Sequence, residues 1–378
     1  MPRMFDLLRG SGEPDKNNDP AKQEKKIPED HVVKADLPPT PPPKDAPVNF
    51  PKAMLHNEHK SDQPDDYSLV SQKLIAAVRQ HGVDNEDSAS KIYNDAVATI
   101  NALLDKSKTT EDLSEFAPRI NEALDNIFNQ LLLGDNLLDN VYKAKQEDYY
   151  LPYHIVNVLI LSFAIGLSMK FNKSRMDDLG KAVIFSDTGL DELRDIVTKP
   201  RKLTEEEKCW VEAHIAKSLK FAERVAPLDD AVKEAIQMHH ERDNGKGYPR
   251  GLQKNTISPY AKIIGVVDTY EALTHKRNYI DEMGAHKAIK LLLGSLREYF
   301  DMDVMKAFIN RMSVYPVGSL VLLNTKEIAK VVSVHPGSPL RPIVMITQDA
   351  SGKPSKENTI IDLSVQDFPT IQDSFQSS

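Results

Sequence analysis

Apolar residues recur at helical spacing over most of this chain. Between residues 67 and 147 they return every three or four positions, in three groups separated by polar stretches. This spacing is typical of amphipathic helices, in which one face is buried and the opposite face meets water. The predicted helices cover residues 69–78, 92–104 and 120–132. No titratable cluster falls in this region, so it is interpreted as a regulatory or dimerising unit without chemistry of its own.

The helical pattern continues from residue 148 to residue 313. Its most apolar run, 155–169, contains Asn157 and Ser162. The run is shorter than the roughly 20 apolar residues that a membrane span needs. It is therefore predicted to be a buried core helix, and no transmembrane segment is expected.

The pattern changes to short alternating runs after Pro316. Four runs read as strands with turn residues between them, at 319–323, 328–334, 342–347 and 359–363. We expect a small antiparallel extension over 314–366 and a flexible tail over 367–378. The leader, 1–66, is rich in Pro, Lys, Asp and Glu, a composition typical of disordered or extended chain. The fold class is therefore mainly α with a small β appendage.

Composition narrows the class of partner. The chain has 378 residues, of which 40% are hydrophobic, and a formal net charge of −8. This charge argues against a general nucleic-acid binder, because affinity for phosphate backbones depends on clustered Lys and Arg. The single cysteine, Cys209, cannot form an internal disulfide, and no signal-peptide pattern opens the chain. A cytoplasmic location is the expectation, with proteins or small molecules as partners.

Six polar residues are embedded in the apolar helical sequence between 148 and 313. They are His154, Asp187, His214, His239, His240 and Asp268. A buried, unpaired carboxylate costs several kcal/mol, so Asp187 and Asp268 require a cation or strong hydrogen-bond donors. Four imidazoles and two carboxylates suit one or two divalent ions such as Fe, Mn or Zn. The alternative is a scaffold in which the histidines only form hydrogen bonds within the helical core.

The segment 239–249 reads HHERDNGKGYP. Adjacent histidines on a helix point about 100° apart, so they face different metals unless one bends inward from the helix end. Gly245 and Gly247 allow positive φ angles, and Pro249 fixes the backbone after Tyr248. We expect a metal-centred site beside a rigid loop.

These motifs resemble the HD-GYP family over residues 150–363. The likeness is carried by the order of the six polar residues, by HHERDNGKGYPRGL and VVDTYEALTHKRNY, and by the C-terminal YPVGSLVLL. It implies a helical domain with two or three metals that hydrolyses cyclic di-GMP to pGpG or GMP through a metal-bridging hydroxide. It also implies metal ligation by His154, Asp187, His214, His239, His240 and Asp268, with Asp187 as the bridging, catalytic carboxylate. Substrate contacts would come from Gly247, Tyr248, Pro249 and Arg277.

The sequence departs from the family pattern at four positions. Ser186 replaces the histidine of the His-Asp pair, and Leu190 replaces a lysine that would stabilise the transferring phosphoryl group. Tyr150 stands where some members have a glutamate, and Ile280 replaces a second substrate-binding cation. One site is then left with His154, Asp187 and Asp268. Because the glutamate replaced by Tyr150 would complete a third metal site, two metals at most are expected. Losing one preorganised donor costs on the order of 3 kcal/mol, or about 10²- to 10³-fold in rate.

These departures favour a degenerate regulator over an active enzyme. Such a regulator would bind cyclic di-GMP, or would use the loop 243–252 to dock a partner such as a diguanylate cyclase domain. The alternative is an active metal-dependent phosphodiesterase acting on cyclic di-GMP. Homodimerisation is compatible with both.

Overall fold

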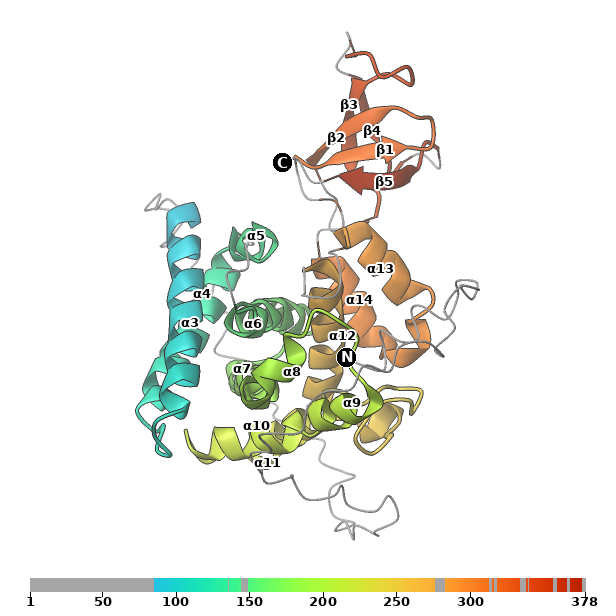
Figure 1. Ribbon diagram of the computed structural model, residues 1–378. Helices are drawn as coiled ribbons and strands as arrows, with labels where there is room; N and C mark the ends of the chain where they lie inside the picture. Colours follow the sequence, from blue (N-terminus) through green and yellow to red (C-terminus); the bar gives the residue numbers. More distant parts are fainter. Residues whose placement is uncertain are drawn as a thin grey trace, which may run out of the picture. The chain divides into compact units, whose positions relative to one another are not determined.

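The structure is a computed structural model that describes residues 85–134, 136–143, 149–275, 283–312, 315, 318–333, 338, 340–355, 359–365 and 368–375 (Figure 1). The predicted leader, the predicted helix at 69–78, and both Arg277 and Ile280 lie outside the described residues. Within the described part the chain is mainly helical and ends in a small antiparallel sheet, as the sequence predicts.

The N-terminal region contributes three helices to the described structure. They are α3 (Asn85–Ser107), α4 (Phe116–Leu133) and α5 (Asn136–Lys143). The first two confirm the helices predicted at 92–104 and 120–132, whereas α5 was not predicted. Apolar residues at helical spacing, such as Ile100 on α3 and Ile127 on α4, are buried. Helix α3 contacts α4, α5 and the core helix α6, so the N-terminal helices pack directly on the domain that follows.

Helix α6 (Leu151–Ser168) is the core helix of the following domain. Pro152 lies in its first turn, where no backbone N–H is needed for the helix. Among the described helices only α6 is long and apolar enough to cross a membrane, and 83% of that stretch is buried inside the fold. Helices α3, α4, α7, α12 and α14 surround it. This burial confirms the predicted core helix.

The remaining helical elements follow in chain order after α6. They are α7 (Lys173–Ser186), η2 (Thr188–Leu193), α8 (Arg194–Val197), α9 (Glu205–Glu212), α10 (His214–Glu223), α11 (Asp230–Met238), η3 (Lys254–Thr256), α12 (Pro259–Thr274), α13 (Ala285–Leu293), η4 (Arg297–Tyr299) and α14 (Met302–Arg311). Local capping fixes several starts: Asn172 caps α7, Thr204 and Glu207 form a capping box on α9, and Asp301 caps α14. Around the buried polar residues, α6 contacts α7, α7 contacts α11, α11 contacts α12, and α12 contacts α6.

The C-terminal sheet has the strand order β4-β3-β2-β1-β5, with every pair antiparallel. Its strands are β1 (Leu320–Leu323), β2 (Ile328–Ser333), β3 (Ile343–Gln348), β4 (Ile360–Asp362) and β5 (Ile371–Phe375). The first four confirm the predicted runs. The prediction of a flexible tail is wrong for β5, because Leu320 of β1 is paired with Phe375.

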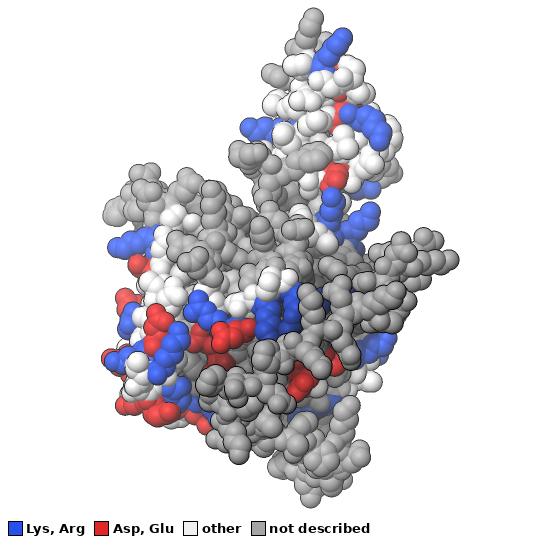
Figure 2. Space-filling model, in the orientation of Figure 1, with Lys and Arg blue, Asp and Glu red and all other residues white. Residues whose placement is uncertain are grey.

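Charged side chains are mixed on the helical part of the surface. On the face drawn in Figure 2, Lys and Arg lie among Asp and Glu, without an extended basic stripe among the described residues. Many of them form ion pairs, such as those of Lys199 and Arg201 with Glu207.

Candidate metal centre

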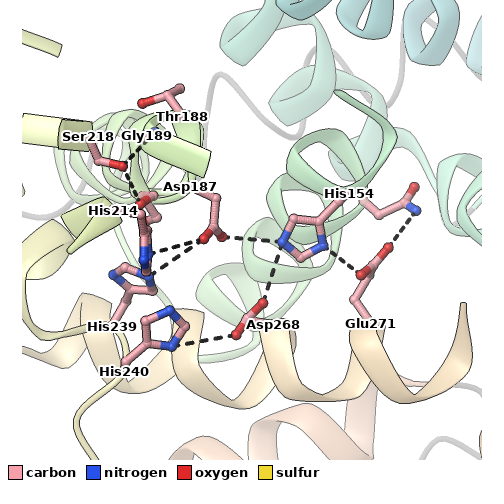
Figure 3. Close-up of polar contacts among 12 residues, drawn as sticks. His154, Asp187, Thr188, Gly189, His214, Ser218, His239, His240, Asp268 and Glu271 are labelled. Carbon is pink, nitrogen blue, oxygen red and sulfur yellow. Dashed lines mark hydrogen bonds and ion pairs between the residues drawn. The ribbon is translucent and has the colours of Figure 1, made fainter. Parts of the chain in front are cut away.

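The six polar residues predicted from the sequence converge at one place. Five helices and their ends supply them (Figure 3). His154 lies in the first turn of α6, Asp187 follows α7, His214 opens α10, His239 and His240 follow α11, and Asp268 lies within α12. All six are between 0% and 5% exposed. Helix packing therefore places four imidazoles and two carboxylates together out of contact with bulk water.

Asp187 lies at the middle of this cluster. Its Oδ2 is 3.2 Å from His154 Nε2, while its Oδ1 is 3.4 Å from His214 Nε2 and 3.9 Å from His239 Nε2. Two overlapping groups result, each with its possible ligand atoms within 4.8 Å of one another. They are His154, Asp187 and Asp268, and Asp187, His214, His239 and His240. The grouping is the one expected for two sites that share Asp187.

Backbone carbonyls fix the proton on two of the imidazoles. His214 Nδ1 lies 2.5 Å from Val211 O, and His239 Nδ1 lies 2.7 Å from Ile236 O. Because a carbonyl only accepts, each Nδ1 carries the proton and each Nε2 presents a lone pair. The two Nε2 atoms are 3.4 Å apart and both face Asp187 Oδ1. Lone pairs and a carboxylate that converge in this way repel one another unless a cation lies between them.

The electrostatics of the cluster favour the metal-binding form of each group. Burial lowers the pKa of His239 to about 3 and lowers the pKa of His214 and of His240 below the ordinary value. These imidazoles are therefore neutral at pH 7. Burial alone would raise the pKa of Asp187, but the side chains of His154, His239 and His214 around it outweigh burial and lower that pKa. Neutral imidazoles beside an ionised carboxylate form a donor set that suits a divalent ion.

The loop after the two histidines packs against the cluster. The Tyr248 ring stacks on His240 with centroids 4.6 Å apart, and Tyr248 N donates to His240 O at 3.2 Å. Glu241, which the sequence analysis did not single out, accepts hydrogen bonds from the backbone N–H groups of Arg250 and Leu252 at 2.7 and 2.8 Å. The loop is thus tied down at both ends, and its tyrosine faces the centre rather than solvent.

The two loop glycines are needed for different reasons. Gly245 has a φ of +76°, as expected. Gly247 does not use the same freedom, because its φ is not positive. A Cβ at Gly247 would lie 2.5 Å from Arg242 N, from Glu241 Cα and from His240 O. Close approach of two backbone segments therefore requires glycine there, and it keeps Tyr248 against His240.

Comparison with known proteins places this arrangement in a family. Residues 139–304 match the HD domain family, and residues 320–377 match a KOW domain associated with the HD domain. The chain is 30% identical over 243 residues to a cyclic di-GMP phosphodiesterase of Pseudomonas aeruginosa, covering 64% of this chain and 58% of that protein. The chain carries an HD domain.

Further relatives support the same assignment. A cyclic di-GMP phosphodiesterase of Borreliella burgdorferi is 29% identical over 192 residues, 50% of each chain. A 3'3'-cGAMP-specific phosphodiesterase of Vibrio cholerae is 29% identical over 192 residues, 49% of this chain and 42% of the relative. The chain thus spans about half the length of these relatives. An HDG"Y"P protein of Bdellovibrio bacteriovorus has a similar fold, with a TM-score of 0.50 at 18% identity over 64% of this chain and 78% of that one.

The departures from the HD-GYP pattern lie at the edge of the cluster. Ser186 is buried, and its hydroxyl donates to Ala182 O at 2.6 Å, so it is bonded to the backbone of α7. Leu190 lies in η2, and its backbone N–H donates to Asp187 O at 2.9 Å. The Tyr150 ring lies 6.2 Å from the His154 ring, centroid to centroid. Each of these three positions is therefore next to a cluster residue, while Arg277 and Ile280 lie outside the described residues.

Glu271 is the member of the site that the sequence analysis missed. Its Oε2 lies 2.6 Å from His154 Nδ1, on the side of the ring away from Asp187 (Figure 3). Glu271 is fully buried on α12, three residues after Asp268. Residues three apart share a helix face, so a second acid in the apolar segment IIGVVDTYEAL was the signal available in the sequence.

Proposed function

We propose that the chain is an HD-GYP protein that binds a cyclic dinucleotide, above all cyclic di-GMP, at a centre for one or two divalent ions, and that it serves mainly as a regulator with strongly reduced hydrolysis. The observation that carries this proposal is the contrast within the site. The buried ligand set around Asp187 is assembled. Ser186 and Leu190, however, place a backbone-bonded hydroxyl and an aliphatic chain where the family has a ligand and a cation.

The residues of the two groups would each hold one metal ion. His214, His239 and His240 with Asp187 would hold one ion, and His154 and Asp268 with Asp187 would hold the second. A divalent ion bound there supplies a Lewis acid and lowers the pKa of a bound water. Burial of the six side chains excludes bulk water from the centre, and the fixed Nδ1 protons orient the imidazoles.

Reduced hydrolysis follows from the missing charge at position 190. The half-buried Leu190 cannot donate to a phosphoryl oxygen, and one lost donor of this kind costs about 10²- to 10³-fold in rate. The affinity for cyclic di-GMP is reduced less than the rate of hydrolysis, because contacts to any metal and to the loop 243–252 also contribute to binding. The regulatory proposal therefore predicts cyclic di-GMP affinity without comparable turnover.

The test combines three measurements on protein loaded anaerobically with Fe or Mn. Elemental analysis gives the metal content, calorimetry gives cyclic dinucleotide binding, and chromatography detects pGpG and GMP. The proposal expects bound metal, a measurable Kd and little product. Bound metal with neither cyclic di-GMP nor 3'3'-cGAMP binding would refute it, and metal-free protein after loading would favour the scaffold alternative.

An active phosphodiesterase is the second candidate. It is favoured by the two ligand groups that remain around Asp187 and by the relatives described above, all of which are named as phosphodiesterases. It predicts multiple turnovers of cyclic di-GMP or 3'3'-cGAMP that stop in Asp187→Ala. Both dinucleotides are needed in the assay, because the relatives named above include enzymes of both specificities.

Docking of a diguanylate cyclase domain through the loop 243–252 stays a prediction. Tyr248 is buried against His240, so the exposed residues Lys246, Pro249 and Arg250 would make such a contact. Homodimerisation and a cytoplasmic location are also retained as parts of the proposal.

A further inference from the structure

A buried chain of hydrogen bonds leads from His154 to the N-terminal helices. Glu271 Oε2 lies 2.6 Å from His154 Nδ1, and Asn157 Nδ2 donates to Glu271 Oε1 at 3.3 Å. Tyr93 Oη, on α3, donates to Asn157 Oδ1 at 2.9 Å. Each of these four residues is at most 5% exposed. These hydrogen bonds therefore connect α12, α6 and α3 without solvent in between.

We propose that Glu271 is a positioning residue for His154, and that Tyr93, acting through Asn157, makes helix α3 part of the support of the metal centre. This inference rests on the proposed metal centre for its consequence, but its geometry stands on the hydrogen bonds alone. It revises the interpretation of the N-terminal helices as a unit without chemistry of its own.

The carboxylate of Glu271 determines which nitrogen of His154 faces the cluster. An ionised carboxylate only accepts hydrogen bonds, so the proton lies on Nδ1 and the Nε2 lone pair points to Asp187 and Asp268, 3.2 and 3.4 Å away. A hydrogen bond of this kind orients the ring and raises its basicity as a ligand. A glutamine could satisfy Asn157 but would not hold the His154 proton by charge.

Tyr93 and Asn157 in turn hold the carboxylate. The side-chain oxygen of Asn157 accepts from Tyr93 and its amide nitrogen donates to Glu271, so these two hydrogen bonds fix the orientation of the amide. Burial, together with the charge of Glu271, raises the pKa of Tyr93 above its ordinary value, so the hydroxyl keeps the proton it donates. A buried network that is fully bonded has one arrangement, and removing one member loosens the next.

A second contact joins the same carboxylate to α5. His275 Nδ1 lies 3.5 Å from Glu271 Oε1, and His275 Nε2 lies 3.0 Å from Val141 O on α5. Two helices of the N-terminal region therefore reach the surroundings of Glu271, α3 through Asn157 and α5 through His275, and these two residues lie 3.5 Å apart (Asn157 Nδ2 to His275 Nε2). A signal that shifts α3 or α5 against α6 would change how firmly His154 is held.

The experiment compares three single-atom or single-group changes. Glu271→Gln removes the charge, Tyr93→Phe removes only the hydroxyl, and Tyr260→Phe is the matched control. Tyr260 is also a buried tyrosine, and its hydroxyl donates to Asp178 at 3.3 Å, outside this network. Thermal unfolding of each variant confirms that it folds, and Tyr93→Phe, which keeps the ring, serves where Glu271→Gln is unstable.

The first readout needs neither metal nor activity. NMR of ¹⁵N-histidine-labelled, metal-free protein, with His154 assigned from His154→Ala, reports which ring nitrogen carries the proton. The expected result is protonated Nδ1 in the wild type, a loss of that preference in Glu271→Gln, a partial loss in Tyr93→Phe and no change in Tyr260→Phe. Protonated Nε2 in the wild type, or no effect of Glu271→Gln, overturns the proposal.

The second readout is a Co²⁺ titration followed by absorption. Glu271→Gln is expected to weaken one of two sites by about 10- to 100-fold. Tyr93→Phe should weaken the same site by roughly two- to tenfold, because it removes one more distant hydrogen bond. The site of His214, His239 and His240 should be unchanged in both. Equal behaviour of Tyr93→Phe and Tyr260→Phe overturns the role of α3. A wild type that binds no metal refutes the proposed metal centre, while the NMR result still decides the present inference.

Discussion

At the scale of single residues, the sequence was informative where an acidic side chain lies among residues that are expected to be buried. Asp187 and Asp268 are acids within or beside apolar helices, and both were predicted to meet the histidines that now surround them. Glu271 was missed because a sequence shows candidate metal ligands but not the groups that hold them in place. Its spacing of three residues from Asp268 was visible, but its partner His154 is 117 residues away, a distance that no local pattern encodes.

The substitution Leu190→Lys tests whether the missing charge limits turnover. The side chain starts in η2, directly after the Asp187 segment, and a lysine there restores a cation that can stabilise the phosphoryl group. We expect product formation to rise by about 10²- to 10³-fold. Leu190→Met, of similar volume and without charge, is the control and should stay at the wild-type rate. An equal rate in both variants would show that another departure is limiting.

At the scale of elements, the helices at 92–104 and 120–132 and the core helix followed from the spacing of apolar residues, whereas α5 and β5 did not. Helix α5 and strand β5 were missed, since five to eight residues carry too few apolar positions to establish a period. The IQDSF of β5 is apolar only at its ends and becomes a strand because β1 offers an open edge. Gly189 packs its backbone against α10, where a Cβ would meet His214 O and Ser218 N. Such approaches appear only in three dimensions.

The loop glycine Gly247 gives a prediction at this scale. In Gly247→Ala the new methyl group would meet three backbone atoms at 2.5 Å, none of which can rotate away. We expect a loss of about 1–3 kcal/mol in the free energy of unfolding, measured with urea. Gly284→Ala is the matched control, because no atom lies within 4 Å of its Cβ position. A loss in Gly247→Ala no larger than in Gly284→Ala would contradict the close approach.

At the scale of the whole molecule, the mainly helical class, the core helix and most of the terminal sheet were predicted correctly. These features depend on periodic burial, which the sequence carries directly. The connection of the N-terminal helices to the site was not predicted. It depends on Tyr93, a residue that reads as an ordinary apolar position of α3 until Asn157 lies beside it.

Global stability should depend on pH in a defined direction once metal is removed. Burial lowers the pKa of His239 to about 3, whereas an unfolded histidine takes up its proton near pH 6.5. Below that pH the unfolded state binds more protons, so the contribution of His239 is fully present above about pH 6.5 and is lost as the pH falls toward 3. The slope is about 1.4 kcal/mol per pH unit for this one group. Urea unfolding of chelator-treated protein at several pH values measures it, and constant stability from about pH 7 to pH 5 would contradict it.

The most direct test of the account is the metal content of Asp187→Asn. Asp187 belongs to both ligand groups, so its loss should empty both sites, whereas Asp178→Asn removes a carboxylate that accepts from Tyr260 away from the centre. After anaerobic loading with Fe or Mn and desalting, elemental analysis is expected to find up to about two ions per chain in the wild type and in Asp178→Asn. Asp187→Asn should retain almost none. Equal metal in all three proteins, or none in the wild type, would contradict a centre built around Asp187.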